Sequence, residues 1–509
     1  MFNTGVIQGV IFFLYIAIMI GIGFLFYAKS NSHSEYILGG RGMNVWVTAL
    51  SAQASDMSGW LLLGLPGLAY ASTLGTTEAI WTAIGLALGT YINWLIVAKP
   101  LRKYTQVANN SLTIPEFLQN RFQDKSGLLR IIPAVFILIF FLIYTASGFV
   151  SGAKLFNLVF GIDYTVALII SIIIIVTYTF LGGFKAVCWT DLVQGIMMFC
   201  AVIIVAAVMY TSLNNVETFD VADLPKIMMF PDGSAESYTW MGIIGAVAWG
   251  LGYFGQPHIL VRFMAIKSPK EVRPARIIAM VWVLVSLAAA VLVGYLGRPY
   301  FDILHQPLAA GAEETIFMVS VTKIFPIVIA SILLSAILAA IMSTADSQLL
   351  VAASAVSGDF YKEFINKNAT DKQLVWISRL TVVGIALLAG IFAANPNSSV
   401  FEIVSHAWAG FGAAFGPIIL CALFWKRTNA KGAIAGIISG GVVALVWAYM
   451  SNIAGLFGVT ELPKIFSLYE IVPGFIVSLA FIFAVSLATE KPSAEMLEQF
   501  ERVKTEEIA

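Results

Sequence analysis

Three apolar stretches of this chain carry polar residues whose types and spacing could bind a small cation and a compact solute. The first stretch, residues 49–60, holds five polar side chains within eight positions: Ser51, Gln53, Ser55, Asp56 and Ser58. A carboxylate at mid-membrane depth costs about 2.5–3.5 kcal/mol on insertion scales. Serine and glycine suit a broken helix that lines a cavity better than a lipid-facing one. The alternative is a packing seam of small residues in which Asp56 bonds to a neighbouring donor.

The second stretch, Trp249–His258, combines three glycines, one proline and three aromatic residues. Glycine and proline weaken a helix, while aromatic rings form rigid walls around a compact, partly apolar solute. The alternative is a kinked helix around a packed aromatic cluster.

The third stretch, residues 333–348, is made mostly of Ala, Leu and Ile and also carries oxygen-bearing side chains. Its polar members are Ser335, Ser343, Thr344, Asp346, Ser347 and Gln348. Small hard cations take carbonyl, hydroxyl and carboxylate oxygens as ligands. Together with carbonyls freed where residues 49–60 unwind, Ser343 and Thr344 predict an all-oxygen cation site. The alternative is that the hydroxyls bond back to carbonyls one turn earlier.

The composition places these stretches in a membrane. Hydrophobic residues make up 59% of the 509 residues and charged ones only 11%, whereas about a quarter of a soluble chain is charged. Lys plus Arg equals Asp plus Glu, with 29 each, which gives no sign of a nucleic-acid partner. The three cysteines and four histidines are scattered, and neither a metal-binding spacing nor an organic-cofactor motif is present.

Thirteen apolar segments predict an all-α integral membrane protein with about 13 transmembrane helices. Their approximate limits are 5–28, 44–71, 76–98, 128–158, 161–183, 190–212, 238–262, 276–297, 318–357, 373–393, 399–425, 430–452 and 465–488. The first segment is followed rather than preceded by a basic residue, so we interpret it as a permanent span and not as a signal peptide. Residues 1–490 are predicted to form one transmembrane domain, followed by a short tail, 491–509.

The charges of the connecting loops predict the orientation. An odd number of spans puts the two termini on opposite sides of the membrane. With the N-terminus outside, the cytoplasmic loops and tail contain 24 of the 29 basic residues. The outer side keeps Lys154, Lys226, Arg298, Lys323 and Lys464. The positive-inside rule therefore predicts an external N-terminus and a cytoplasmic C-terminus in the cell membrane.

The two glycine-interrupted stretches hold corresponding places in the chain. Each opens a set of five spans, about 44–212 and 238–425, and five is odd, so the second set enters the membrane in the opposite sense. Paired broken helices at such positions indicate a transporter site at the interface of inverted repeats. No nucleotide-binding motif is present, so uphill transport would have to use an ion gradient.

Seven motifs of this chain belong together: Tyr36–Arg41, Ser51–Trp60, Leu112–Pro115, Gly182–Asp191, Trp249–His258, Met342–Thr344 and Ala407–Gly416. They resemble the motifs of the sodium:solute symporter family, and within it those of the bacterial sodium/proline symporters. The resemblance runs from about residue 10 to about residue 490. It implies a LeuT-type core of 5+5 inverted repeats, with one helix before it and two after. It also implies sodium-coupled symport of L-proline by alternating access, with sodium as the coupling ion, no organic cofactor and no enzyme activity.

The resemblance also implies which residues form the sites. Sodium would bind the carbonyls of Ala54, Met57 and Ala340 and the hydroxyls of Ser343 and Thr344, with Asp56 in support. Proline would lie against Ser55, Ser58, Gly59 and Trp60, and Tyr144, Trp249, Tyr253 and Pro257 would close around its ring. Some proline symporters lack a carboxylate at the position of Asp346. With Ser343, Ser347 and Asp191, it could form a second sodium site, or it could be a structural partner.

The nearest alternative function is sodium-coupled symport of another small solute by the same fold, such as another amino acid, pantothenate or a sugar. A pocket with Trp249 and Tyr253 but no intramembrane arginine favours a small zwitterion. A channel is disfavoured because the glycine-rich segments are paired within one chain. A sensor would usually carry a soluble signalling domain, and no enzyme motif is recognisable. Proton or lithium coupling stays open, and the predicted mechanism requires no oligomer.

Overall fold

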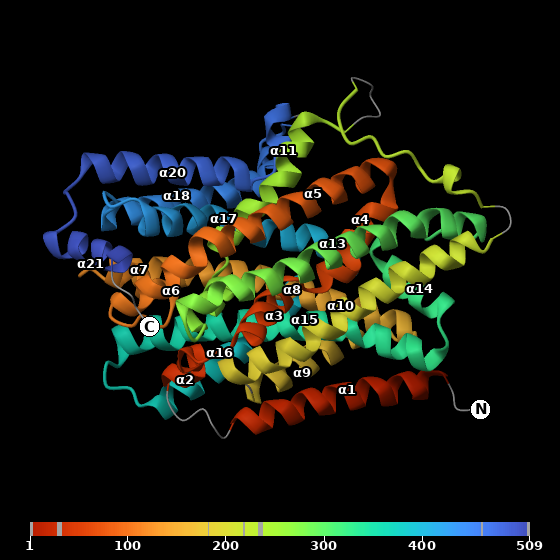
Figure 1. Cartoon of the computed structure of the whole chain (residues 1–509), viewed down its shortest axis with the longest axis horizontal. Helices are drawn as coiled ribbons and strands as arrows, with labels where there is room; N and C mark the ends of the chain where they lie inside the picture. The colour runs from red at the N-terminus through yellow and green to blue at the C-terminus, as the bar shows by residue number, and fades with distance from the viewer. Residues whose placement is uncertain are drawn as a thin grey trace.

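The computed structural model describes residues 4–27, 33–181, 183–216, 219–232, 238–459 and 462–505. These residues form a bundle of helices without any β-strand (Figure 1). Some predicted features fall outside them: Ala28 at the end of the first expected span, Lys29, Gly182, and residues 506–509 of the tail. Residues 1–3, 30–32, 217–218, 233–237 and 460–461 of the predicted transmembrane domain also lie outside the described residues.

The α-helices of the described residues follow one another in this order: α1 (Thr4–Tyr27), α2 (His33–Leu38), α3 (Val45–Asp56), α4 (Leu65–Ala71), α5 (Thr73–Ile92), α6 (Ala98–Val107), α7 (Ile114–Arg121), α8 (Leu128–Phe160), α9 (Tyr164–Leu181), α10 (Phe184–Asn214), α11 (Trp240–Ala248), α12 (Pro257–Ala265), α13 (Val272–Ile303), α14 (Ile316–Ile324), α15 (Ile327–Ser354), α16 (Asp371–Phe392), α17 (Val400–Phe424), α18 (Ala430–Ala448), α19 (Met450–Leu456), α20 (Ile471–Ala488) and α21 (Ala494–Thr505). The longer ones run roughly parallel to the long axis of the bundle (Figure 1).

Among the described residues, ten helices are long and apolar enough to cross a membrane. Three shorter apolar helices, Trp60–Ala71, Tyr164–Phe180 and Trp240–Gly255, fall inside the other three predicted segments. Two of these three, Trp60–Ala71 and Trp240–Gly255, belong to interrupted helices, so their continuous apolar length is shorter than that of the other ten. The total of thirteen crossings stays a prediction.

Helix α1 begins at one end of the bundle and helix α21 lies at the opposite end (Figure 1). We call these the N-terminal end and the C-terminal end. Part of the predicted tail is helical: Met496, Phe500 and Val503 of α21 are buried, and the Phe500 ring lies 6.3 Å from that of Tyr104 in α6.

The first polar stretch is a broken helix. Helix α3 ends at Asp56, and Met57 leaves the helical conformation with φ −84° and ψ 80°. A single π-helical turn, η2 (Trp60–Gly64), then leads into α4. The break frees backbone carbonyl and N–H groups at residues that are fully buried, as a binding site inside a membrane requires.

The second polar stretch is broken in a similar way. Helix α11 passes into a 3₁₀ segment, η5 (Trp249–Gly255), and Gln256 is extended with φ −80° and ψ 106° before α12 begins at Pro257. Proline at the first helical position is well placed there, because that N–H would have no helical partner. Both predicted interruptions are therefore present.

Glycines let neighbouring helices approach the two broken ones closely. A Cβ on Gly89 of α5 would collide with the backbone of Gly250 in η5, and a Cβ on Gly294 of α13 would collide with the Pro66 carbonyl oxygen in α4. Helix α3 packs against α10, α12, α13 and α15. These contacts place the break in α3 at the centre of the bundle.

Candidate cation and solute site

The Asp56 carboxylate lies at the break in α3, and the side chain is fully buried. Its Oδ2 accepts a 2.6 Å hydrogen bond from the Tyr253 hydroxyl of η5. Its Oδ1 has no hydrogen-bond partner among the described residues. The Asp56 backbone carbonyl accepts from Trp60 Nε1 and from the Tyr144 hydroxyl, each at 3.1 Å. One residue therefore links the two broken helices to α8, and it keeps one carboxylate oxygen available.

Hydroxyls of α15 meet a carbonyl of α3 beside this break. Ser343 Oγ donates to the Ala54 carbonyl at 2.7 Å and lies 3.3 Å from the Ala340 carbonyl oxygen. Thr344 Oγ1 also reaches the Ala54 carbonyl, at 3.3 Å. Four of the five predicted sodium ligands thus lie in one contact group. The fifth, Met57, occupies the break itself.

Other hydroxyls of α15 bond back along their own helix. Ser335 Oγ donates to the Ser331 carbonyl at 2.9 Å, and Ser347 Oγ donates to the Ser343 carbonyl at 2.8 Å. The alternative interpretation therefore holds for these two serines. It does not account for Ser343, whose shortest bond crosses to α3.

Aromatic rings close around the break. The rings of Trp60 and Trp249 lie 6.4 Å apart with their planes tilted by 42°. Trp60, Tyr144 and Tyr253 are each 1% exposed and Trp249 is 4% exposed. The predicted solute-binding residues from α3, η2, α8 and η5 are therefore together, and their side chains are closed off from solvent.

The other residues that were predicted to contact the solute differ from one another in where their side chains lie. Gly59 faces Ser151 of α8 so closely that a Cβ would collide with its hydroxyl. The Ser55 hydroxyl donates to the Ala52 carbonyl at 3.2 Å, and Ser58 Oγ lies 3.5 Å from the Trp60 amide. Pro257 begins α12 and lines a separate small cavity towards Ile137 and Val261.

Trp408 of α17 was missed by the sequence analysis. Its Nε1 donates to the Trp249 carbonyl at 2.7 Å, and its ring packs edge-on against Tyr253 at 4.9 Å. A Cβ on Gly252 would collide with the same indole. The motif Ala407–Gly416 contained this residue, but nothing in that motif indicated a contact with η5.

Arg262 corrects the prediction that no arginine lies inside the membrane-spanning bundle. It belongs to α12 and its side chain is 1% exposed. The guanidinium donates to Asp191 Oδ2 at 3.3 Å, to Ser51 Oγ at 3.1 Å and to the Ser347 hydroxyl. Arg262 is the last residue of the predicted segment 238–262, and that boundary position led us to count it among the loop charges.

This arginine lies where a second sodium site was predicted. Asp191 and Asp346 are fully buried, and Ser51 Oγ donates to Asp191 Oδ2 at 2.6 Å. Asp191 Oδ1 and Asp346 Oδ2 have no hydrogen-bond partner among the described residues. The guanidinium thus pairs with Asp191, and the Ser347 hydroxyl, which lies 3.2 Å from Asp346 Oδ1, connects it with the second carboxylate.

Glu314 ties four elements together at the N-terminal end of the bundle. It lies in the short turn η7 (Glu313–Thr315). Its carboxylate accepts from Lys154 Nζ of α8 at 2.6 Å and from the Val400 and Phe401 amides of α17 at 3.0 Å each. Its backbone covers Gly67 of α4, where a Cβ would lie 2.7 Å from the Glu314 Cα. This contact fastens the N-terminal side of the central site.

A model of the sodium:solute symporter family matches residues 36–440. The sodium/proline symporter of Escherichia coli K12 is 46% identical over 499 residues, covering 96% of this chain and 95% of that protein. The osmoregulated proline transporter of Bacillus subtilis 168 is 45% identical over 484 residues, covering 94% of each chain.

Two solved structures share the fold at low sequence identity. A Na⁺-coupled sialic acid symporter in an outward-open state aligns with a TM-score of 0.74 and 20% identity, over 96% of this chain and all of that one. A nucleobase-cation-symport-1 family transporter in a closed conformation aligns with a TM-score of 0.52 and 14% identity, over 93% of this chain and 98% of that one.

Proposed function

This chain belongs to the sodium:solute symporter family, and we propose that it carries L-proline into the cell together with sodium, by alternating access. It is a multi-pass protein of the cell membrane with an all-helical, LeuT-type fold. The observation that supports the sodium site best is the 2.7 Å contact between Ser343 of α15 and the Ala54 carbonyl of α3, beside Asp56.

The proposed sodium ligands are the carbonyls of Ala54, Met57 and Ala340 and the hydroxyls of Ser343 and Thr344. All are oxygens, which suits a hard monovalent cation. Asp56 lies between Ala54 and Met57 in the chain, and its carboxylate would supply the negative charge that a cation needs at a depth without water. Because α3 and α15 contribute ligands from opposite sides, sodium would hold the two helices together.

The proposed proline site lies on the other side of the same break. Ser55, Ser58, Gly59 and Trp60 would line it from the broken helix, and Tyr144, Trp249 and Tyr253 would surround the ring. Pro257 would join them only if it turned from the separate cavity that it lines here. N–H groups at the start of a half-helix favour a carboxylate. The aromatic walls offer the flat apolar contact that a pyrrolidine ring fits.

Both sites share the break in α3, and this gives a physical route for coupling. Sodium would order residues 54–57, and an ordered break presents its N–H groups to the solute. By linkage, proline must then raise the affinity for sodium by the same factor. Release of the Glu314 contacts would open the site towards the N-terminal end of the bundle. Release of contacts at the C-terminal end would open it in the other direction, so that the two sides have access in turn.

A second sodium ion is proposed for the site around Asp191, Asp346 and Ser347. Asp191 pairs with the Arg262 guanidinium, so the buried Asp346 carboxylate, if ionised, would leave one negative charge unbalanced, and a cation could neutralise it. The Arg262 guanidinium would have to move away from Ser347 to make room. A measured stoichiometry of one sodium per proline in both the wild type and Asp346→Ala would reject this second site and leave Asp346 with a structural role.

We also propose an external N-terminus and a cytoplasmic C-terminus, supported by the distribution of loop charges. In this orientation Glu314 and Lys154 lie on the outer side and α21 on the cytoplasmic side. Residues 1–490 would form one transmembrane unit, with repeats at about 44–212 and 238–425 and a tail from residue 491.

The experiment that tests the proposed function is uptake of radiolabelled L-proline into proteoliposomes. We expect concentrative uptake with an inward sodium gradient and none when choline replaces sodium. Asp56→Ala should abolish it, whereas Asp302→Ala, at an exposed carboxylate, should not. Absence of proline uptake under every ion gradient would contradict the assigned solute.

A further inference from the structure

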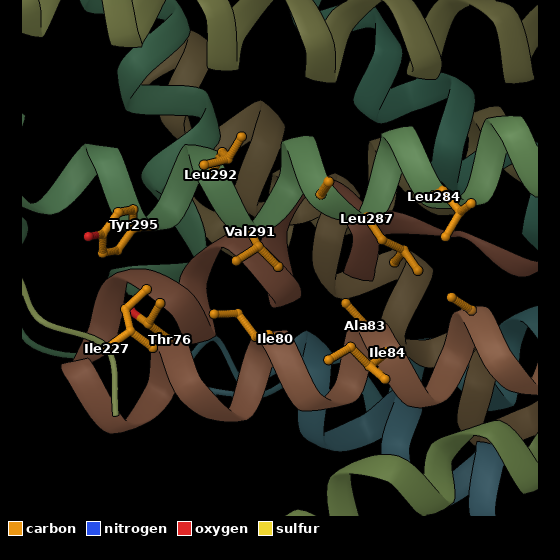
Figure 2. Close-up of a pocket in the computed structure, with 12 residues that line it drawn as sticks. Thr76, Ile80, Ala83, Ile84, Ile227, Leu284, Leu287, Val291, Leu292 and Tyr295 are labelled. Carbon is orange, nitrogen blue, oxygen red and sulfur yellow. The ribbon is translucent and has the colours of Figure 1, made fainter. Parts of the chain in front are cut away.

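A groove of about 450 Å³ lies between helices α5 and α13 (Figure 2). Side chains from the two helices face each other across it, with Ile80 and Ala83 on one wall and Leu287 and Val291 on the other (Figure 2). Its size falls in the range of small-molecule pockets, about 300–1,000 Å³. None of the residues assigned to sodium or proline lines it.

The described residues that line the groove offer no free polar side chain. Among the described residues that line it, two side chains carry an oxygen, and both hydroxyls are already bonded elsewhere. Thr76 Oγ1 donates to the Ala69 carbonyl at 2.7 Å, and the Tyr295 hydroxyl donates to the Pro225 carbonyl at 2.9 Å. Apolar cavities of this kind exclude water and would leave a charged solute without partners. The occupant must therefore be a hydrocarbon.

A segment of chain, residues 225–230, closes the N-terminal end of the groove. We call it the strap. Ile227 lines the groove, and Trp81 Nε1 of α5 donates to the Met229 carbonyl at 2.8 Å. The Phe230 ring packs on Trp81 at 5.5 Å. Since Tyr295 holds Pro225 from the opposite helix, the strap is attached to both walls.

Helices α5 and α13 are both long and apolar enough to cross a membrane, so the open side of the groove would face membrane hydrocarbon. Ile84, Leu284 and Leu292 line it and are 36%, 54% and 44% exposed. The exposed apolar surface continues along both helices, through Leu88 of α5 and Val281 of α13. A lipid tail could thus enter sideways and end under the strap.

We propose that this groove binds one acyl chain of a membrane phospholipid. A chain that leaves the bilayer gains no hydrophobic free energy, because lipid tails are as apolar as the leucines that line the groove. Binding rests instead on close packing between two walls and the strap. This distinguishes a bound chain from the lipids that exchange freely over the rest of the surface.

The position of the groove connects it with the transport machinery. Each wall of the groove packs closely on one of the broken helices through a glycine. Helix α5 meets η5 at Gly89, and helix α13 meets α4 at Gly294. An acyl chain that fixes the distance between α5 and α13 would therefore affect the positions of both η5 and α4.

The test uses the purified full chain in nanodiscs that contain a phospholipid with a photoreactive diazirine in its acyl chain. After irradiation, labelled peptides are mapped by mass spectrometry. We expect enrichment on residues 76–87, 227 and 284–295 over the lipid-facing surface of α10. Ala83→Phe fills the groove and should lower this labelling about tenfold, the change expected for 1.4 kcal/mol of lost affinity. The matched control is Ala207→Phe, on the exposed face of α10, which should leave it unchanged.

Labelling that is spread evenly over all lipid-facing helices, or that persists in Ala83→Phe, would overturn the proposal. If that variant does not fold, Ala288→Phe fills the groove from the opposite wall and gives the same comparison. The readout is independent of proline uptake, so failure of the lipid site and failure of the proposed function are distinguishable.

Discussion

The Tyr253 hydroxyl donates a 2.6 Å hydrogen bond to the Asp56 carboxylate, and in doing so joins the two broken helices of the bundle. Asp56 ends α3 and Tyr253 lies in η5, 197 residues further along the chain. Both side chains are buried, so this bond couples the conformation of one break to that of the other.

Replacement of Tyr253 by phenylalanine tests this bond. It leaves a buried carboxylate with one partner fewer, a change that costs about 1–3 kcal/mol. We expect the sodium concentration for half-maximal uptake to rise about tenfold or more. Tyr210→Phe is the matched control, because Tyr210 is 46% exposed on α10 and should behave as wild type. Equal sodium dependence in the two variants would show that the bond has no role in coupling.

The buried pair of Arg262 and Asp191 predicts a strong and non-additive effect on stability. Removal of one partner leaves an uncompensated buried charge, at a cost of about 3–5 kcal/mol. Arg262→Met and Asp191→Leu should each lower the melting temperature clearly, and the double variant should recover much of the loss. Thermal unfolding in detergent measures all three. Additive losses would contradict the pairing of these two side chains.

The contacts of Glu314 predict that the N-terminal end of the bundle acts as a gate. Glu314→Gln keeps the shape of the side chain but removes the charge that pairs with Lys154 and caps α17. We expect slower uptake, together with faster labelling of a cysteine introduced at Phe401, because this end opens more often. The matched control is Glu313→Gln, in the same turn. If labelling of the cysteine were unchanged in Glu314→Gln, the contact would not act as a gate.

The sequence predicted much of this arrangement because membrane burial makes polar residues conspicuous. Asp56, Ser343 and Thr344 were found by type alone, since few functions other than binding justify such groups in an apolar segment. The two breaks were likewise indicated by glycine and proline. These local signals need no knowledge of how the helices pack.

The residues that were missed act only through packing between distant segments. Arg262 ends its predicted span, and its burial depends on α12 being short and lying against α3. Trp408 occupies an ordinary-looking apolar helix, and it matters because Gly252 lets its indole reach Trp249. Neither contact can be predicted from the spacing of residues within one segment.

The most direct test of sodium-coupled proline transport through this site is the linkage between the two ligands at equilibrium. Proline affinity is measured with and without sodium, and sodium affinity with and without proline, in the wild type, Ser343→Ala and Ser335→Ala. The wild type should show the same factor in both directions. Ser335→Ala, whose hydroxyl bonds back along α15, should keep that factor, and Ser343→Ala should lose most of it. Proline binding that ignores sodium in the wild type, or full linkage in Ser343→Ala, would contradict the account.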